Sequence, residues 1–141
     1  MPLKGPRLKA SQFLNIDSVT RFMESLQRPS GDIPWHTGGK TDPWDLVETI
    51  MGLNIGGRFD ASLNAFNWLA RCQNPDGSWF SAYLDGHPLD KTRETHMAAY
   101  FSVGLFHYWL ITRQTDVVET FWPVMEKAVK YAVSLQARTG E

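Results

Sequence analysis

The sequence of 141 residues has almost no excess charge of either sign. It carries 14 Lys and Arg against 15 Asp and Glu, which gives a formal net charge of -1. Nucleic-acid binding depends on basic side chains that neutralise phosphates, so this balance argues against a nucleic-acid partner. Hydrophobic residues make up 43% of the chain and charged residues 21%, which supplies a folded core and argues against disorder.

Cysteine and long apolar runs are also scarce. The single Cys72 excludes a disulfide within the chain. The sequence begins without a charged segment followed by an apolar one, so we expect no secretion and a cytoplasmic location. The longest mostly apolar run, Met97 to Ile111, is too short to cross a hydrocarbon core of ~30 Å as a helix. We therefore expect no transmembrane segment.

Most of the chain shows the spacing of amphipathic helices, and aromatic residues are abundant at 13%. Helices are expected at about 19–26, 43–54, 59–73, 97–111 and 121–136. Asp17 or Ser18 is the expected cap of the first helix, and Asp42 followed by Pro43 starts the second. No run alternates as a buried strand, although Trp79 to Leu84 could form a short extended piece. The predicted class is all-α.

Two helices carry specific expectations. The helix at 97–111 is apolar on both faces, with Phe101 and Leu105 on one and Val103 and Phe106 on the other, so we expect it to be buried on nearly all sides. In the last helix, Pro123 is tolerable only within the first turn, where a missing N–H does no harm.

Three helix ends share one short pattern, in which a glutamine precedes a glycine by four residues. The pairs are Gln27 and Gly31, Gln73 and Gly77, and Gln136 and Gly140. A proline follows the first two glutamines, and Trp35 and Trp79 follow the first two glycines. We interpret the pattern as a helix terminator. Glycine supplies a positive-φ turn, proline stops the helix, glutamine binds exposed backbone groups, and tryptophan folds back as an apolar lid.

The helices after the first two turns align with an offset of 52 residues. Thr41-Asp42-Pro43-Trp44 then matches Arg93-Glu94-Thr95-His96, and Gly52 matches Gly104. The order corresponds to about two and a half helical hairpins. A repeat array needs a polar cap on its last repeat. We therefore expect residues 1–141 to be the N-terminal half of a longer protein, or to form a homo-oligomer.

The segment Gln73-Asn74-Pro75-Asp76-Gly77-Ser78-Trp79 resembles the repeat signature of the squalene–hopene cyclase, oxidosqualene cyclase and protein prenyltransferase β-subunit family. The resemblance implies an α/α-toroid, whose inner helices line a central cavity, with this chain forming about half of it. It also implies an isoprenoid or another large apolar substrate. The acidic motifs of those enzymes and their Asp–Cys–His zinc site are not found in this chain, so we expect no metal and no cofactor.

In such a toroid, polar residues at the starts of inner helices face the cavity mouth. By position, the candidate catalytic residues are Asp42, Asp45, Glu94 and His96, and the candidate substrate-binding residues are Trp35, His36, Trp44, Arg93 and Tyr100. Simpler roles are open for several of them. Asp42 can serve only as a helix cap, and Arg93, Glu94 and His96 can form a cap and a local ion pair.

Three functions fit these observations. The leading one is an enzyme of the terpenoid cyclase or prenyltransferase type that binds or transforms an isoprenoid. The second is a carbohydrate-active (α/α)6-type enzyme, in which Asp42 or Asp45 works with Glu94 as acid and base while Trp35 and Trp44 stack on sugar rings. The third is a non-catalytic helical-repeat module that binds a protein or a second copy of itself.

Overall fold

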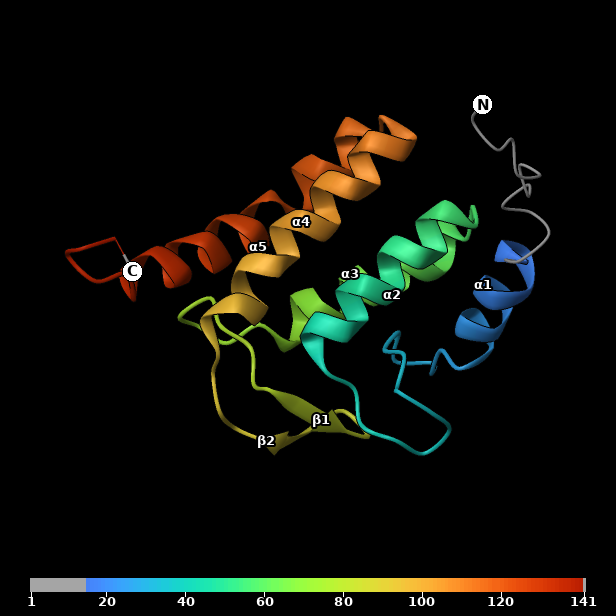
Figure 1. Cartoon of the computed structure of the whole chain (residues 1–141), viewed down its shortest axis with the longest axis horizontal. Helices are drawn as coiled ribbons and strands as arrows, with labels where there is room; N and C mark the ends of the chain where they lie inside the picture. The colour runs from blue at the N-terminus through green and yellow to red at the C-terminus, as the bar shows by residue number, and fades with distance from the viewer. Residues whose placement is uncertain (1–14, 141) are drawn as a thin grey trace, which may run out of the picture.

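The structure, a computed structural model, describes residues 15–140 (Figure 1). Its elements in order are α1 (Ile16–Ser25), α2 (Pro43–Ile55), α3 (Phe59–Cys72), β1 (Ala82–Leu84), β2 (His87–Asp90), α4 (Thr95–Thr112) and α5 (Thr115–Ser134). The chain is therefore mostly helical, with one antiparallel pair of short strands. Within residues 15–140, no helix is long and apolar enough to cross a membrane.

The helix starts follow from local chemistry. The Asp42 carboxylate accepts hydrogen bonds from the backbone N–H groups of Trp44 (2.8 Å) and Asp45 (3.3 Å), and Pro43 occupies the first helical position, as expected. The first helix differs from the expectation. Its cap is Asn15, whose side chain accepts from the Ser18 N–H at 2.9 Å, because an asparagine one turn earlier already satisfies that donor.

The last helix begins earlier than its apolar spacing indicated. It starts at Thr115, so Pro123 lies inside α5 and not in its first turn, and that expectation was wrong. Proline removes one backbone hydrogen bond in a helix interior. The preceding turns form nevertheless, because Val117 and Val118 pack against the core. Tertiary packing thus extends the helix past a residue that normally limits it.

Helices α2 and α4, which the toroid resemblance implied to be inner helices and which are called so below, lie side by side and run in the same direction (Figure 1). Trp44 meets His96 near their first turns, and Asn54 lies 3.5 Å from His107 near their last turns. A Cβ added to Gly104 would lie 2.6 Å from Val47, so this glycine permits the close approach. These are the two helices that the offset of 52 residues aligns in the sequence.

Two further helices, α3 and α5, pack back against this pair. Phe66 of α3 contacts Phe101 of α4 at 5.5 Å and Phe121 of α5 at 5.4 Å between ring centroids. All three rings are buried. Burial of large aromatic side chains contributes about 2–3 kcal/mol each to folding, so this cluster fixes how the two hairpins fit together.

One face of α4 is open. Phe101 and Leu105 are buried as expected, but Val103 and Leu110 are exposed and Phe106 is 58% exposed. The expectation of a helix buried on nearly all sides was therefore wrong for this chain. The physical reason is that α2 and α5 pack against one side of α4, and nothing within residues 15–140 covers the other.

The glutamine turns are confirmed as terminators, and they do more than end a helix. The Gln27 side-chain amide donates to the Gly31 carbonyl (2.9 Å) and to the Ala61 carbonyl of α3 (2.8 Å). Gln73 donates in the same way to Gly77 (3.2 Å) and to Val124 of α5 (2.9 Å). The first and second turns therefore bind the backbone of a later helix.

The predicted tryptophan lid forms in one turn only. Trp79 is buried, stacks on Phe101 at 5.5 Å and donates its indole N–H to the Leu69 carbonyl at 2.8 Å. Trp35 is 55% exposed, so its lid role was wrong. Ile33, two residues after its glycine as Trp79 is, lies buried in the equivalent position.

Candidate functional site

The N-terminal ends of α2 and α4 bring several of the candidate residues together. The ring of Trp44 lies 4.3 Å from that of His96 and 4.8 Å from that of Tyr100, measured between centroids. The Glu48 carboxylate joins the two helices, because one of its oxygens accepts from the Trp44 indole N–H (2.9 Å) and the Tyr100 hydroxyl (3.3 Å). The result is a cluster at the start of both inner helices.

Glu48 was missing from the candidates, although a signal for it existed. The offset that matches Trp44 with His96 also matches Glu48 with Tyr100. Equivalent positions on parallel neighbouring helices face each other, so both matched pairs become contacting pairs. Extending the alignment by one helical turn would have found it.

Asp42 and Glu94 are the N-cap residues of the two inner helices, so they hold equivalent places. The Asp42 carboxylate accepts hydrogen bonds from the first turn of its own helix, whereas the Glu94 side chain makes no capping hydrogen bond. Its oxygens lie instead 3.3 Å from the Ser81 hydroxyl and 3.4 Å from Nδ1 of His96. The two carboxyl groups thus have different surroundings.

Burial raises the pKa of the Asp42 carboxyl above its ordinary value. The nearby negative charge of Asp45 adds to this effect, while the two backbone N–H bonds oppose it. A carboxyl that keeps its proton to higher pH can act as a proton donor. Asp42 therefore caps α2 with a carboxyl group whose pKa is raised by burial.

A groove between α1 and α2 contains two further candidates. Its volume is about 580 Å³, and Trp35, Asp45 and Thr49 contribute its aromatic and polar lining. The remaining wall is apolar and consists of Val19, Phe22, Met23, Leu26, Ile33 and Pro34. The Lys40 ammonium lies 4.1 Å from the centroid of the Trp35 ring. The groove therefore offers a flat aromatic surface beside a carboxylate.

Two candidates lie apart from these groups. Arg93 pairs with Asp76 at 2.7 Å rather than with its neighbour Glu94. Nδ1 of His36 lies 3.0 Å from the Thr37 carbonyl oxygen, within its own loop. Across residues 15–140, no group of three or more His, Cys, Asp or Glu side chains is arranged to hold a metal ion.

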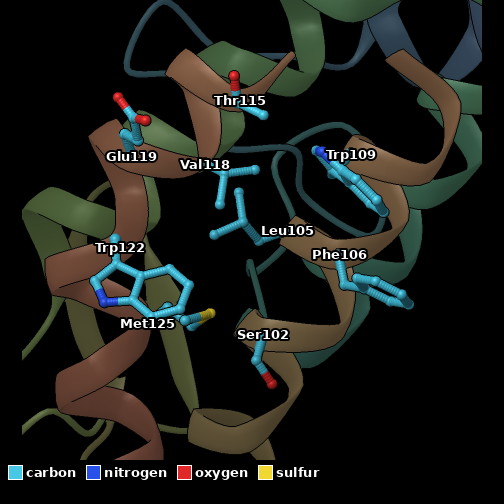
Figure 2. A pocket seen from close by; sticks show the side chains of 9 residues that line it. All are labelled: Ser102, Leu105, Phe106, Trp109, Thr115, Val118, Glu119, Trp122 and Met125. Carbon is cyan, nitrogen blue, oxygen red and sulfur yellow. The ribbon is translucent and has the colours of Figure 1, made fainter. Parts of the chain in front are cut away.

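A second groove runs between α4 and α5, and it is mostly apolar (Figure 2). Its volume is about 420 Å³, and Leu105, Trp109, Val118 and Trp122 are among its lining residues. Trp122 is 53% exposed. Glu119 is its sole ionisable lining residue in the described part of the chain, so this groove does not bring two carboxyl groups together.

Comparison with known proteins identifies a different kind of relative from the one expected. No family model matches the chain. The MMP endo-(1,4)-3-O-methyl-α-D-mannosidase of Mycolicibacterium hassiacum is 40% identical over 123 residues, which is 87% of this chain. The match covers 34% of that enzyme, so the chain spans about a third of the length of the curated relative.

This relative is a glycoside hydrolase, so the resemblance to terpenoid cyclases and prenyltransferases was wrong, and so was the isoprenoid substrate. The structure explains why the motif misled. Trp79 is buried in the core, Gln73 binds helix carbonyls, and Asp76 accepts from the backbone N–H and hydroxyl of Ser78. The motif encodes a helix turn, and a turn does not identify a substrate.

Proposed function

We propose that this chain is part of a glycoside hydrolase that cleaves α-linked mannose chains. The 40% identity to a mannosidase over most of the chain carries the proposal. It agrees with the carbohydrate-active alternative drawn from the sequence. From the name of the relative, the proposed bond is an internal (1,4) linkage between 3-O-methylated mannose units.

The proposed chemistry uses two carboxyl groups in unlike surroundings, as glycoside hydrolysis requires. Asp42, whose pKa is raised by burial, protonates the oxygen of the leaving sugar. Glu94 or Asp45 is the second carboxyl group and acts as the base. His96, 3.4 Å from Glu94, orients that side chain. The positions of Asp42 and Glu94 at the starts of adjacent parallel helices support this assignment.

The proposed sugar contacts come from exposed aromatic rings. Trp35 lines the groove with Asp45 and Thr49, which are able to bind sugar hydroxyls. The methyl group of a methyl ether is apolar, and the ether cannot donate a hydrogen bond, so its expected neighbours are apolar side chains such as Phe22 and Met23 on the same wall. Trp44, held by Glu48, provides a second flat surface.

For the fold as a whole, we propose that these helices form part of an α/α-toroid whose remaining hairpins come from a longer polypeptide, with a second copy of the chain as the alternative. Two features support it. Gln136 binds the Gly140 carbonyl at 2.9 Å but no later helix within residues 15–140, unlike Gln27 and Gln73. The α4–α5 groove, lined by residues of α4 and of the first half of α5, offers an apolar surface for a further helix (Figure 2). A cytoplasmic location remains part of the proposal.

The test is hydrolysis of an α-(1,4)-linked oligosaccharide of 3-O-methylmannose. The release of new reducing ends measures the rate. We expect Asp42→Asn and Glu94→Gln to lower the rate at least about a hundredfold, because each removes a proton-transfer group. The control is Asp116→Asn, which alters an exposed acid in the first turn of α5.

Binding provides a second measurement that does not require a complete catalytic set. The oligosaccharide is titrated into the protein, and NMR spectra record the indole N–H signals of Trp35 and Trp44. Shifts of these signals, with little change for buried Trp79, support a sugar site. Absence of both hydrolysis and indole shifts would contradict the proposed function.

A further inference from the structure

A buried carboxylate lies behind the candidate acid. Asp32 has no solvent exposure, yet it is charged at neutral pH. Burial tends to raise the pKa of its carboxyl, but hydrogen bonds from Ser30, Thr41 and Arg28 outweigh this and hold the pKa below the ordinary value. The Thr41 hydroxyl and the Arg28 guanidinium both donate to one oxygen, each at 2.7 Å.

This network reaches the loop that leads into α2. Thr41 immediately precedes Asp42, and it is buried. Its backbone exchanges two hydrogen bonds with Tyr83 of β1, Thr41 N–H to the Tyr83 carbonyl (2.8 Å) and Tyr83 N–H to the Thr41 carbonyl (2.9 Å). Arg28 also donates to the Gly39 carbonyl at 2.8 Å. The chain is thus fixed on several sides just before Asp42.

We propose that Asp32 is a positioning residue for Asp42, acting through the Thr41 hydroxyl to hold the candidate acid in place at the start of α2. The inference rests on the proposed function, because that function assigns Asp42 as the acid. Asp32 itself is too deeply buried to touch a substrate, so its effect passes through Thr41. A group that must deliver a proton needs a fixed position, since a displacement of ~1 Å can reduce a rate about a hundredfold.

The second repeat contains a related contact, which supports the assignment. Asp76 of the second turn binds Arg93 at 2.7 Å, and Arg93 immediately precedes Glu94, the cap of α4. In both repeats, an acid of the glutamine turn therefore holds the residue in front of the next inner helix. The first contact is buried and the second is exposed. We expect the first to restrain its loop more strongly.

Thr41→Val is the sharpest test, because it removes the hydroxyl but keeps the shape of the side chain and leaves Asp32 paired with Arg28 and Ser30. The matched control is Thr20→Val, since Thr20 is also buried but its hydroxyl binds carbonyls of its own helix. The first measurement is the titration of the Asp42 carboxyl by carbon NMR. We expect its pKa to fall toward the ordinary value in Thr41→Val, because a looser loop lets water in, and to stay unchanged in Thr20→Val.

The second measurement is hydrolysis of the 3-O-methylmannose oligosaccharide. For Thr41→Val we expect kcat to fall about tenfold or more with a smaller change in KM, since the substrate surfaces stay intact. Thr41→Ser restores a hydroxyl and should recover most of the rate. Asp32→Asn should act like Thr41→Val where it folds. An Asp42 titration curve and a kcat that both match the wild-type protein overturn the proposal.

The two measurements keep this inference separate from the proposed function. If the wild-type chain hydrolyses no mannoside, the proposed function fails in this chain, but the Asp42 titration still reports whether Thr41 positions that carboxyl. If hydrolysis occurs and Thr41→Val changes neither the titration nor kcat, the proposed function stands and the positioning role of Asp32 is wrong.

Discussion

The first and second glutamine turns share one backbone but place their side chains differently. The first reads Ser30-Gly31-Asp32 and the second Asp76-Gly77-Ser78, so the acid and the serine have exchanged places. In both turns the serine hydroxyl donates to the acid. The turn itself accepts either order. The order decides whether the negative charge is buried, as for Asp32, or lies at the surface, as for Asp76.

The lid position differs as well. In the second turn Trp79 fills it, and in the first turn the smaller Ile33 does. Because Ile33 takes the buried place, Trp35 is released to the surface and lines the groove with Asp45. With Ile33 in the lid position, Trp35 two residues later remains as an exposed aromatic surface. Turns with the same backbone thus bury a tryptophan in one copy and expose one in the other.

The largest expected difference between the two turns concerns their tryptophans. Trp79→Ala should lower the free energy of unfolding by about 4 kcal/mol, because it leaves a large cavity against Phe101 and loses the bond to Leu69. Trp35→Ala should change it by less than about 0.5 kcal/mol while weakening sugar binding. Urea unfolding measures both. Equal losses of stability would show that Trp35 packs as a lid after all.

The glycines should give the next largest effect. A Cβ on Gly77 would lie 2.2 Å from the Lys127 carbonyl oxygen, and φ is +94° there. Gly77→Ala should therefore cost about 3 kcal/mol, and Gly31→Ala a similar amount, because its Cβ would meet the Asn64 carbonyl at 2.3 Å. Gly86→Ala is the control, since φ is +78° but its Cβ would meet nothing within 4 Å. It should cost only about 1 kcal/mol. A loss as large as that for Gly77→Ala would mean that strain, not contact, explains the effect.

A smaller difference is expected between the second and third turns. Gln73→Ala should lower the free energy of unfolding by about 1–2 kcal/mol, because the Gly77 and Val124 carbonyls both lose a donor. Gln136→Ala should cost less than about 0.5 kcal/mol in this chain, since Gln136 is exposed and its one bond lies within its own turn. Thermal unfolding of both variants measures the difference. A large loss of stability for Gln136→Ala would show that the Gln136 side chain makes contacts beyond its own turn.

The smallest expected effect is a pH dependence that separates the two acids. Hydrogen bonds hold the pKa of Asp32 below 3.8 in the folded chain, so below that pH the unfolded chain takes up a proton that the folded chain resists. The stabilising contribution of Asp32 is complete at neutral pH and is lost as the pH falls through its folded pKa. The advantage of wild type over Asp32→Asn should therefore stay nearly constant from neutral pH down toward 3.8 and shrink as the pH falls below it in urea titrations.

The same experiment on the second turn provides the comparison. The pKa of Asp76 is also lowered, chiefly by the Ser78 hydroxyl, so its pH dependence has the same sign. Its ion pair with Arg93 is exposed and screened by water, so the change for Asp76→Asn should be smaller. A larger change for Asp76 than for Asp32 would reverse the assignment of buried and surface charge.

Much of the fold could be predicted because its signals are local. The cap at Asp42 and the proline after it are read from adjacent residues, and the three glutamine turns repeat at short range. The start of α5 and the open face of α4 could not be predicted in this way. Both depend on which surfaces other helices cover, and apolar spacing alone does not say whether a neighbour is present.

The sequence predicted which residues begin the two aligned helices, but it missed Glu48 and did not predict the contacts between the side chains. The alignment of the two helices matched Asp42 with Glu94 and Trp44 with His96, and the second pair is in contact. It did not show that Arg93 turns away to Asp76. Long flexible side chains choose among several nearby partners, and that choice depends on the folded geometry of the loops around them.

The sequence by itself determined that this chain forms helical hairpins, because helix caps, glycine turns and apolar spacing act over a few residues. It also determined which polar residues begin the inner helices. Only the tertiary structure decided that Ile33 rather than Trp35 is buried, that Asp32 reaches Thr41, and that Glu48 joins Trp44 to Tyr100. These outcomes depend on competition between distant side chains for the same buried space and the same hydrogen-bond partners.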